Sequence, residues 1–324
     1  MNKTIKIEIS HKTIIFTFVF FFLLRFLWSL RDLIFSLLIA FIIMSALKPV
    51  INFFLKLKIP RVVAAVLAYL IFLFSFIYLL IFIIPSFVSQ IAQFIFVLPE
   101  IFSSLSPEIK NLVNFNSLFQ YLPNITNNLI RTVSNLFSNV VFIVSTLFFG
   151  FYFLLEEDLI KTTLIRFFDE KKAEEVALIF SRIEKKLGNW CWGEIKLMIL
   201  VGLLNYLGFL LIGLKYALPL AIIAGFLEVI PNLGPTIAAF PAVLIGFSQS
   251  PLIGLSAIAV AFIVQQLENN VVVPLIMKKA TGFNPIVILI ALIVGGRVGG
   301  VLGVLLALPI LIIIESVFQD LIKK

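Results

Sequence analysis

The sequence predicts an all-α, polytopic helical membrane protein. Of its 324 residues, 61% are hydrophobic and only 13% are charged, whereas soluble domains are about 45–50% apolar and about 25% charged. The apolar residues also lie in long runs, and about 20 consecutive apolar residues cross a bilayer core about 30 Å thick as a helix. We therefore expect about eight hydrophobic membrane segments with amphipathic interfacial helices. A soluble enzyme, a nucleic-acid-binding protein and a disulfide-stabilised secreted domain are excluded.

The sequence carries no recognisable catalytic or cofactor motif. The single cysteine, Cys191, cannot form an internal disulfide and matches no metal-ligand spacing. The single histidine, His11, lies in the basic amino-terminal tail, so no histidine-based triad can form. There is no phosphate-binding lysine motif for ATP hydrolysis. We expect no enzyme activity, no cofactor and no metal, so active transport would have to use an ion gradient or a separate subunit.

The amino-terminal region, residues 1–84, is expected to contain three spans at about 13–30, 33–47 and 62–84. Arg31 and Asp32 separate the first two spans, which predicts a helical hairpin with its turn at Leu30–Asp32. Lys48-Pro49 is expected to end the second span, because proline cannot continue regular helical hydrogen bonding.

Two amphipathic regions flank a fourth span at 136–155. In residues 85–135, four prolines cut the chain into short pieces, and apolar residues recur at helical spacing against polar ones, which predicts interfacial helices on the extracytoplasmic side. Residues 156–196 are highly charged, with an apolar stripe from Val176 to Leu187. The many basic residues of this region predict that it is a cytoplasmic helical region.

The carboxyl-terminal membrane core, 197–324, is expected to contain two continuous and two broken segments. The continuous segments lie at about 197–213 and 251–273. The segment 217–249 is broken at Ile230–Pro235, and it either crosses the membrane or re-enters. The segment 285–314 is broken at Gly295–Gly300 and is expected to be a re-entrant hairpin, because the lysine pairs on either side of it are best placed in the cytoplasm.

The net charge of +8 is explained by orientation. Basic residues precede the first span, follow the second span and crowd the region after the fourth. All three places fall on one side if each of the first four segments crosses once. Since cytoplasmic loops are rich in Lys and Arg, we expect a multi-pass protein with a cytoplasmic amino terminus.

The first candidate site is Glu228 with the helix break that follows it. Pro231 and Pro235, around Asn232 and Gly234, remove backbone donors and free carbonyl groups. Unwound backbone at membrane depth is tolerated only inside protein or beside water, and transporters use it to bind solutes and ions. The alternative is a tight surface loop with Glu228 reaching the membrane interface.

The second candidate site is a polar cluster inside the apolar segment that ends at Pro274. It comprises Gln265, Gln266, Glu268, Asn269 and Asn270. Gln265, Glu268 and Asn269 are spaced to share one helical face and could coordinate a cation, relay a proton or bind a polar solute. The alternative is a hydrogen-bonded clamp between helices, worth about 0.6 kcal/mol per contact.

The third candidate is the glycine-rich break. Gly295, Gly299 and Gly303 recur every four residues, a spacing that lets two membrane helices approach closely. Arg297 lies between them and needs a carboxylate, a carbonyl group or water as a partner. Glu228 and Glu268 are its plausible partners, so Arg297 joins the candidate solute or ion pathway.

These motifs resemble those of the AI-2E family of bacterial permease-like proteins, and the resemblance extends over nearly the whole chain. The motifs that carry it are Phe226–Pro235 followed by Pro241, Gln265–Asn270 followed by Pro274, Asn284-Pro285, and Gly295-Gly296 with Gly299, Gly303 and Pro309. The resemblance implies a homo-oligomer in the bacterial cytoplasmic membrane, and either export of autoinducer-2 or exchange of sodium or lithium for protons. The matching positions are Glu228, Pro231, Gly234, Pro235, Gln265, Glu268, Asn269 and Pro274.

The functional hypothesis is a secondary transporter of a small polar solute, or of a monovalent cation in exchange for protons. A non-coupled channel or efflux pore would need the same polar lining without alternating access. A membrane scaffold would instead depend on the helices of 85–135 and 169–187 as docking surfaces.

Overall fold

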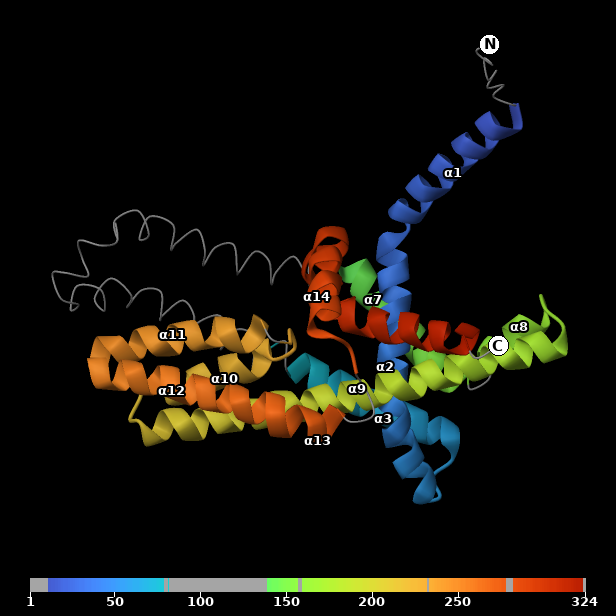
Figure 1. The fold of residues 1–324 in the computed structure, drawn as a ribbon. Coiled ribbons are helices and arrows are strands. Elements are labelled where there is room, and N and C mark those ends of the chain that lie inside the picture. The colour runs from blue at the N-terminus through green and yellow to red at the C-terminus, as the bar shows by residue number, and fades with distance from the viewer. Residues whose placement is uncertain are drawn as a thin grey trace, which may run out of the picture.

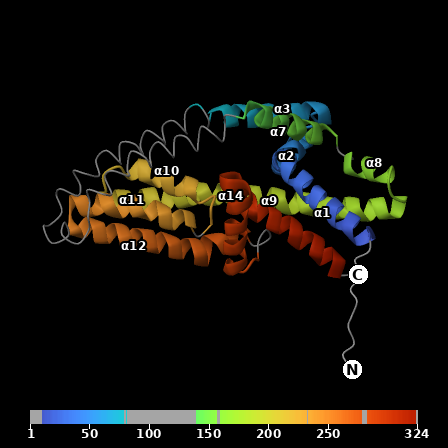
Figure 2. The same ribbon diagram turned by 90° about the horizontal axis from the view of Figure 1, so that it is seen from above.

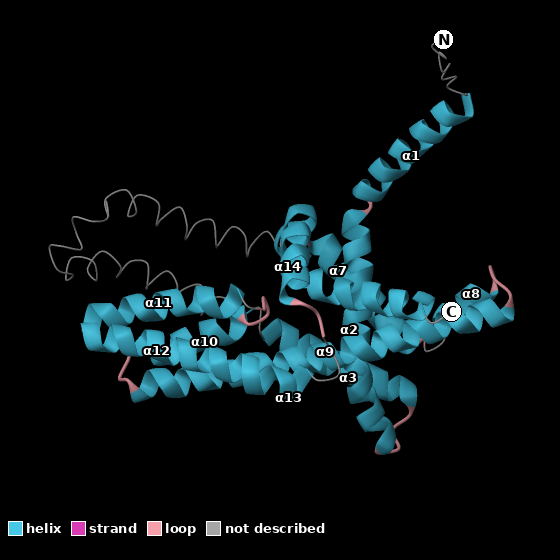
Figure 3. Cartoon of the chain, in the orientation of Figure 1, coloured by secondary structure: helices cyan, strands magenta, loops and turns pink. Residues whose placement is uncertain are grey.

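The computed structural model describes residues 11–78, 81, 139–156, 159–231, 233–277 and 282–322, and these form helices joined by short loops, without a strand (Figure 3). Among them, five helices are long and apolar enough to cross a membrane: α2 (Arg31–Lys56), α3 (Arg61–Tyr78), α9 (Glu170–Leu211), the run Pro251–Met277, and α14 (Pro285–Ile322). Three shorter helices are also apolar: α7 (Val140–Leu155), α10 (Ala217–Leu227) and α11 (Leu233–Gln249). This arrangement confirms the predicted all-α, polytopic membrane fold.

The predicted hairpin at the amino terminus is wrong. Only Leu30 separates α1 (His11–Ser29) from α2, and helical hydrogen bonding runs through it, from the Leu30 amide to the Phe26 carbonyl and from the Ile34 amide to the Leu30 carbonyl. Helix α1 therefore projects away from the other helices (Figure 1). The segment contains no glycine or proline, and although Ser29 and Asp32 are common in turns, helical hydrogen bonding continues past them.

The second helix does not end at Lys48-Pro49 but continues through the proline to Lys56. Pro49 has no amide hydrogen, so the Ser45 carbonyl one turn earlier is left without its helical donor. Gly188 of α9 packs directly against this carbonyl, and the indole nitrogen of Trp192 donates to the neighbouring Ala46 carbonyl at 2.9 Å. The proline therefore marks the place where α9 crosses α2.

A bundle of α2, α3 and α7 forms one part of the molecule, with α3 and α7 side by side in Figure 2. The buried hydroxyl of Thr146 donates to Ser36 at 2.9 Å, which links α7 to α2. The hydroxyl of Tyr69, on α3, donates to the Leu147 carbonyl of α7. These polar links inside an apolar bundle set the register of the three helices.

Helix α9 runs without interruption across residues 196 and 197, where the sequence suggested a change from a charged region to a span. No proline interrupts it, and buried positions recur every three or four residues from Ile183 to Phe209. The buried residues of α9 are Ala173, Ile183, Leu187, Gly188, Trp190, Gly193, Glu194, Leu197, Val201, Asn205 and Phe209. A short helix, α8 (Leu159–Ile165), precedes it. The predicted interfacial helices of 85–135 lie outside the described residues.

An ion pair fastens the charged half of α9 to α2. Lys48 Nζ lies 2.5 Å from Glu184 Oε1, and the two side chains are 36% and 16% exposed. We expect a double-mutant cycle of Lys48→Met and Glu184→Gln to show a coupling of about 1 kcal/mol in the free energy of unfolding in detergent, because the pair is partly shielded from water.

The control is the pair Lys161–Glu174, at 3.7 Å and 43% and 62% exposed, for which we expect almost no coupling. If the effects of Lys48→Met and Glu184→Gln were additive within about 0.3 kcal/mol, the ion pair would not contribute to this junction.

The second part of the molecule is a bundle of α9, α10, α11 and α12 (Pro251–Leu267), which lie side by side in both views (Figures 1 and 2). Helices α10 and α11 pack against each other, so the segment 217–249 is a broken pair of helices. Helix α12 continues through a π-helical turn, η2 (Glu268–Val272), into α13 (Val273–Met277).

Helix α14 is also broken, at Gly300. This residue has φ +58°, a left-handed conformation that glycine adopts without strain, and the helix changes direction there (Figure 1). Gly295 and Gly303, on opposite sides of the bend, pack backbone against backbone. The two predicted interruptions, in 217–249 and 285–314, are therefore both present in the fold.

Candidate functional site

Glu228 lies where α10 ends and the chain turns into α11. The last turn of α10 tightens, with the Ile230 amide donating to the Leu227 carbonyl at 3.0 Å, and the Gly234 amide donates to Ile230 at 2.8 Å. Gly234 packs so closely on Leu227 that a Cβ atom would overlap its carbonyl oxygen. This tight turn holds Glu228 inside the protein, where it is 2% exposed.

Glu268 lies at the first residue of the π-helical turn and is 3% exposed. Pro274 explains the π turn, because in a regular α-helix its ring would collide with the carbonyl of Asn270. The helix widens instead, and the Val273 amide donates to the Glu268 carbonyl five residues earlier. Such π turns inside α-helices occur frequently at functional sites.

The two interruptions bring Glu228 and Glu268 together. Their carboxyl groups are within hydrogen-bonding reach of each other, and Gln265 Nε2 donates to Glu268 Oε2 at 3.3 Å. Glu228 Oε2 finds no donor among the described residues, although its side chain is almost completely buried. A buried oxygen without a partner costs about 1–3 kcal/mol, which a bound ion or proton would offset. We call these residues the Glu228–Glu268 pair.

The rest of the polar cluster is divided between the inside and the outside of the bundle. Gln265 is half-buried beside Glu268, whereas Asn269 and Asn270 are exposed. The wider π turn changes the angular spacing, so Asn269 does not share the buried position of Glu268. Asn270 Nδ2 donates to the Gln266 carbonyl at 2.9 Å, within its own helix.

The prolines frame the two interruptions. Pro231 and Pro235 are partly buried on either side of the turn after α10, and Pro274 is exposed in α13. Asn232 lies outside the described residues.

The glycine-rich segment lies on α14, apart from the Glu228–Glu268 pair. Gly299 packs against the ring of Phe35 on α2, and Gly295 packs against Gly303 inside the bent helix. Arg297 is exposed, and among the described residues it forms no ion pair with Glu228 or Glu268.

The structure adds two polar residues that the sequence reasoning missed, Glu194 and Asn205. Both are buried on α9, at 5% and 7% exposed, and α9 packs against α10 and α12, the helices next to the pair. The sequence places Glu194 in the charged cytoplasmic region 156–196, where lysines flank it. The signal that could have identified it is the three- or four-residue recurrence of buried positions along α9, which includes both residues.

The paired carboxyl groups can share a proton or accept a cation. In the part of the chain that the structure describes, no three His, Cys, Asp or Glu side chains are grouped closely enough to hold a metal ion. An ionised carboxylate only accepts hydrogen bonds, so a hydrogen bond between Glu228 and Glu268 requires one proton between them. When that proton leaves, the two carboxylates repel each other, and another cation can take its place.

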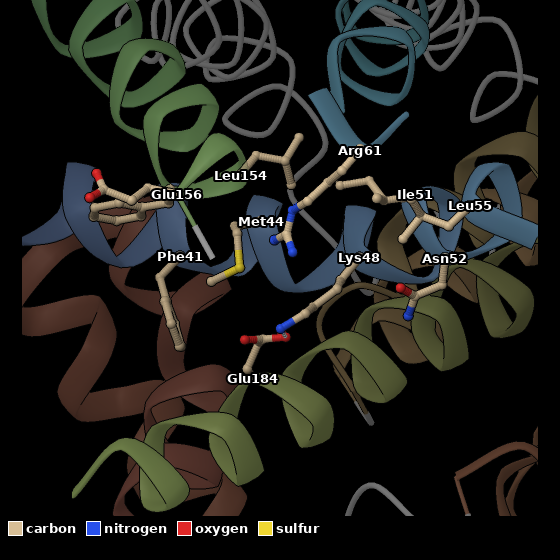
Figure 4. Close-up of a pocket in the computed structure, with 11 residues that line it drawn as sticks. Phe41, Met44, Lys48, Ile51, Asn52, Leu55, Arg61, Leu154, Glu156 and Glu184 are labelled. Carbon is tan, nitrogen blue, oxygen red and sulfur yellow. Dashed lines mark ion pairs between the residues drawn. The ribbon is translucent and has the colours of Figure 1, made fainter. Parts of the chain in front are cut away.

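A pocket elsewhere in the protein is a separate feature. It lies between α2, the start of α3, the end of α7 and the charged half of α9, and Figure 4 shows Lys48, Arg61 and Glu184 directed into it. Its apolar wall includes Phe41 and Met44. None of its lining residues belongs to α10 or η2, so this pocket and the Glu228–Glu268 pair are different sites.

Comparison with known proteins identifies similar chains that are associated with transport. A family model described as AI-2E family transporter matches residues 14–323. YueF, a candidate transport protein of Bacillus subtilis, is 29% identical over 320 residues, covering 92% of this chain and 86% of its own. The candidate transport protein sll0060 of Synechocystis is 27% identical, over 82% of this chain and 81% of its own. PerM, a candidate permease of Escherichia coli, is 26% identical, over 52% of this chain and 48% of its own.

Proposed function

The chain belongs to the AI-2E family of transporters, and from that premise we propose that it is a secondary transporter whose substrate site is the Glu228–Glu268 pair. It moves a small polar solute, or exchanges a monovalent cation for protons, across the bacterial cytoplasmic membrane. The amino terminus faces the cytoplasm, and the protein assembles as a homo-oligomer in the bilayer.

One observation carries this proposal: two carboxyl groups from two separate helix interruptions meet inside an apolar bundle. Glu228 and Glu268 are 2% and 3% exposed, and one oxygen of Glu228 has no donor among the described residues. Ionisable groups within a membrane cost about 2.5–3.5 kcal/mol each on insertion scales. A purely structural role would be served equally well by apolar residues, whereas binding a cation or a proton requires these oxygens.

The chemistry of two adjacent carboxyl groups favours coupled exchange over uncoupled passage of an ion or solute. The pair can hold one proton or one monovalent cation, because each neutralises the repulsion between the two carboxylates. If the site opens to one side of the membrane at a time, loading with a proton on one side and with a cation on the other gives coupled exchange. The broken helices α10–α11 and α12–α13 are elements that could change their relative positions to open it.

Reconstitution into liposomes tests the proposal. Vesicles containing the purified protein receive an imposed proton gradient, and uptake of Na⁺, Li⁺ and labelled small polar metabolites is measured in one preparation. We expect one of these probes to accumulate against its own gradient, and accumulation to stop when a proton ionophore is added.

The outcomes separate the proposal from its alternatives. Flux that only runs downhill would contradict coupling and indicate a channel or efflux pore. No flux of any probe, in vesicles where the protein is folded and inserted, would contradict the transporter and favour a membrane scaffold.

A further inference from the structure

Glu194 is a buried acid that the site described above does not require. It is 5% exposed, and its Oε1 atom has no hydrogen-bond donor among the described residues. It lies on the buried side of α9 between Trp190 and Leu197, which belong to an apolar cluster with Met277, Leu308 and Ile312. A glutamine would pack in the same space without a charge, so the position does not need an acid for packing.

Two contacts between α9 and the α12–α13 run show where Glu194 lies along the helix axis relative to the Glu228–Glu268 pair. Gly193 packs against Met277, and Gly208 packs against Val260, so α9 and the α12–α13 run are antiparallel. Glu268 is midway between Val260 and Met277, and therefore lies level with the middle of the stretch from Gly193 to Gly208. Glu194 is then about two helical turns from Glu268, towards the charged half of α9.

The same geometry places Glu194 near an edge of the hydrocarbon core. Measured back from Leu211, where α9 ends, Glu194 lies about 26 Å along the helix at about 1.5 Å per residue. The hydrocarbon core is about 30 Å thick. The next turns towards the start of α9 carry Arg182, Lys185 and Lys186. Glu194 thus lies between the water-facing charged half of α9 and the pair.

The groups that face Glu194 are few. The carboxyl groups of Glu228, which follows α10, and Glu268, in η2, are close enough to Glu194 to repel it, and the Cys191 thiol lies one turn earlier on α9. Helix α14 contributes Leu308 and Ile312 to the surrounding cluster. The acid of α14 nearest in the same direction, Glu315, pairs instead with Lys186 at 3.4 Å. No cation in the described part of the chain neutralises Glu194.

We propose that Glu194 is a second binding site, which we call the second station, for a monovalent cation or a proton. It lies between the Glu228–Glu268 pair and the membrane face that is next to the charged half of α9. An ion that leaves the pair in this direction binds Glu194 before it reaches water, and the unpartnered Oε1 atom of Glu194 provides a ligand. This station rests on the proposed transport function, since it serves the same pathway.

The first test compares transport by Glu194→Gln, Glu194→Asp and Glu174→Gln with wild type. Glu174→Gln removes the same charge from the same helix at an exposed position. We expect Glu194→Gln to slow gradient-driven exchange about tenfold or more and to change its dependence on pH, because a neutral amide can neither bind a proton nor pass it on. Glu194→Asp restores exchange in part, and Glu174→Gln behaves as wild type.

A second measurement needs no transport. A hydrophobic carbodiimide, which reacts with protonated carboxyl groups in apolar surroundings, is applied to the protein in liposomes, and labelling of Glu194 is measured by mass spectrometry. We expect Glu194 to be labelled, and Na⁺ or Li⁺ to slow labelling relative to choline at equal ionic strength. The same protection is expected in Glu268→Gln, where the pair is disabled.

The two tests distinguish failure of the second station from failure of the proposed transport function. If Glu268→Gln loses exchange while Glu194→Gln keeps the wild-type rate and pH profile, the second station is wrong and the transporter stands. If no variant transports but Glu194 is labelled and protected by cations, the station stands without the proposed function. If Glu194 is unlabelled, or labelled equally in all salts, the station is overturned.

Discussion

Replacing Glu268 by glutamine should reduce gradient-driven transport about 100-fold or more, the usual cost of losing a positioned proton-transfer group. Glutamine fills the same volume and can still pair with Gln265, but it neither ionises nor holds a proton between itself and Glu228. The measurement is the initial rate of exchange in liposomes at several pH values, with the amount of inserted protein determined for each variant.

Two controls accompany this prediction. Folding should not suffer, because the substitution removes a buried ionisable group, so the free energy of unfolding in detergent should be unchanged or higher than that of wild type. Glu174→Gln, at an exposed position of α9, should transport at the wild-type rate. Wild-type transport by Glu268→Gln at every pH would refute the role assigned to the pair.

The second large effect concerns the bend in α14. A Cβ atom at position 303 would overlap the carbonyl oxygen of Gly295, with backbone on both sides and no flexible side chain to move away. Gly303→Ala should therefore force the two halves of α14 apart and lower the free energy of unfolding by about 1–3 kcal/mol, the usual cost of overpacking. Unfolding in detergent, followed by circular dichroism, measures this loss.

The matched control lies on the same helix. A Cβ atom at position 296 would lie 3.3 Å from a methyl group of Val304, a contact that a side-chain adjustment relieves. Gly296→Ala should therefore change stability by less than about 1 kcal/mol. Equal stability of Gly303→Ala and wild type would mean that the close approach of Gly295 and Gly303 does not hold the bend.

The sequence was sufficient to identify Glu228 and Glu268 as candidate site residues, because the energetic cost of an acid in an apolar run depends only on that run. An acid within an apolar run is unusual whatever surrounds it, and both Glu228 and Glu268 lie beside prolines that interrupt a helix. Their meeting could not be predicted, because it depends on how α10 and the π turn pack. Glu194 was missed for the opposite reason: its neighbours in the sequence are charged, and its burial is visible only when α9 is seen as one helix.

The positions at which helices break or continue were also predicted only in part. Glycine and proline predicted where the segments 217–249 and 285–314 break. The same reasoning was wrong at Pro49, where the packing of Gly188 and Trp192 on α2 stabilises a helix that continues through the proline. It was also wrong at Leu30–Asp32, because a charged pair between two apolar runs does not by itself turn the chain.

The length of α10 has an electrical consequence. The loop before it carries exposed Lys215 and Tyr216, residue types that favour the membrane interface. The helix has 11 residues, so Glu228 at its end lies about 16 Å deeper, near the centre of a core about 30 Å thick. An ion that reaches Glu228 from either face therefore crosses about half of the membrane voltage, or about 1.2 kcal/mol per 100 mV, half the value for a full crossing. Ion occupancy at Glu228 should thus change about sevenfold for each 100 mV applied.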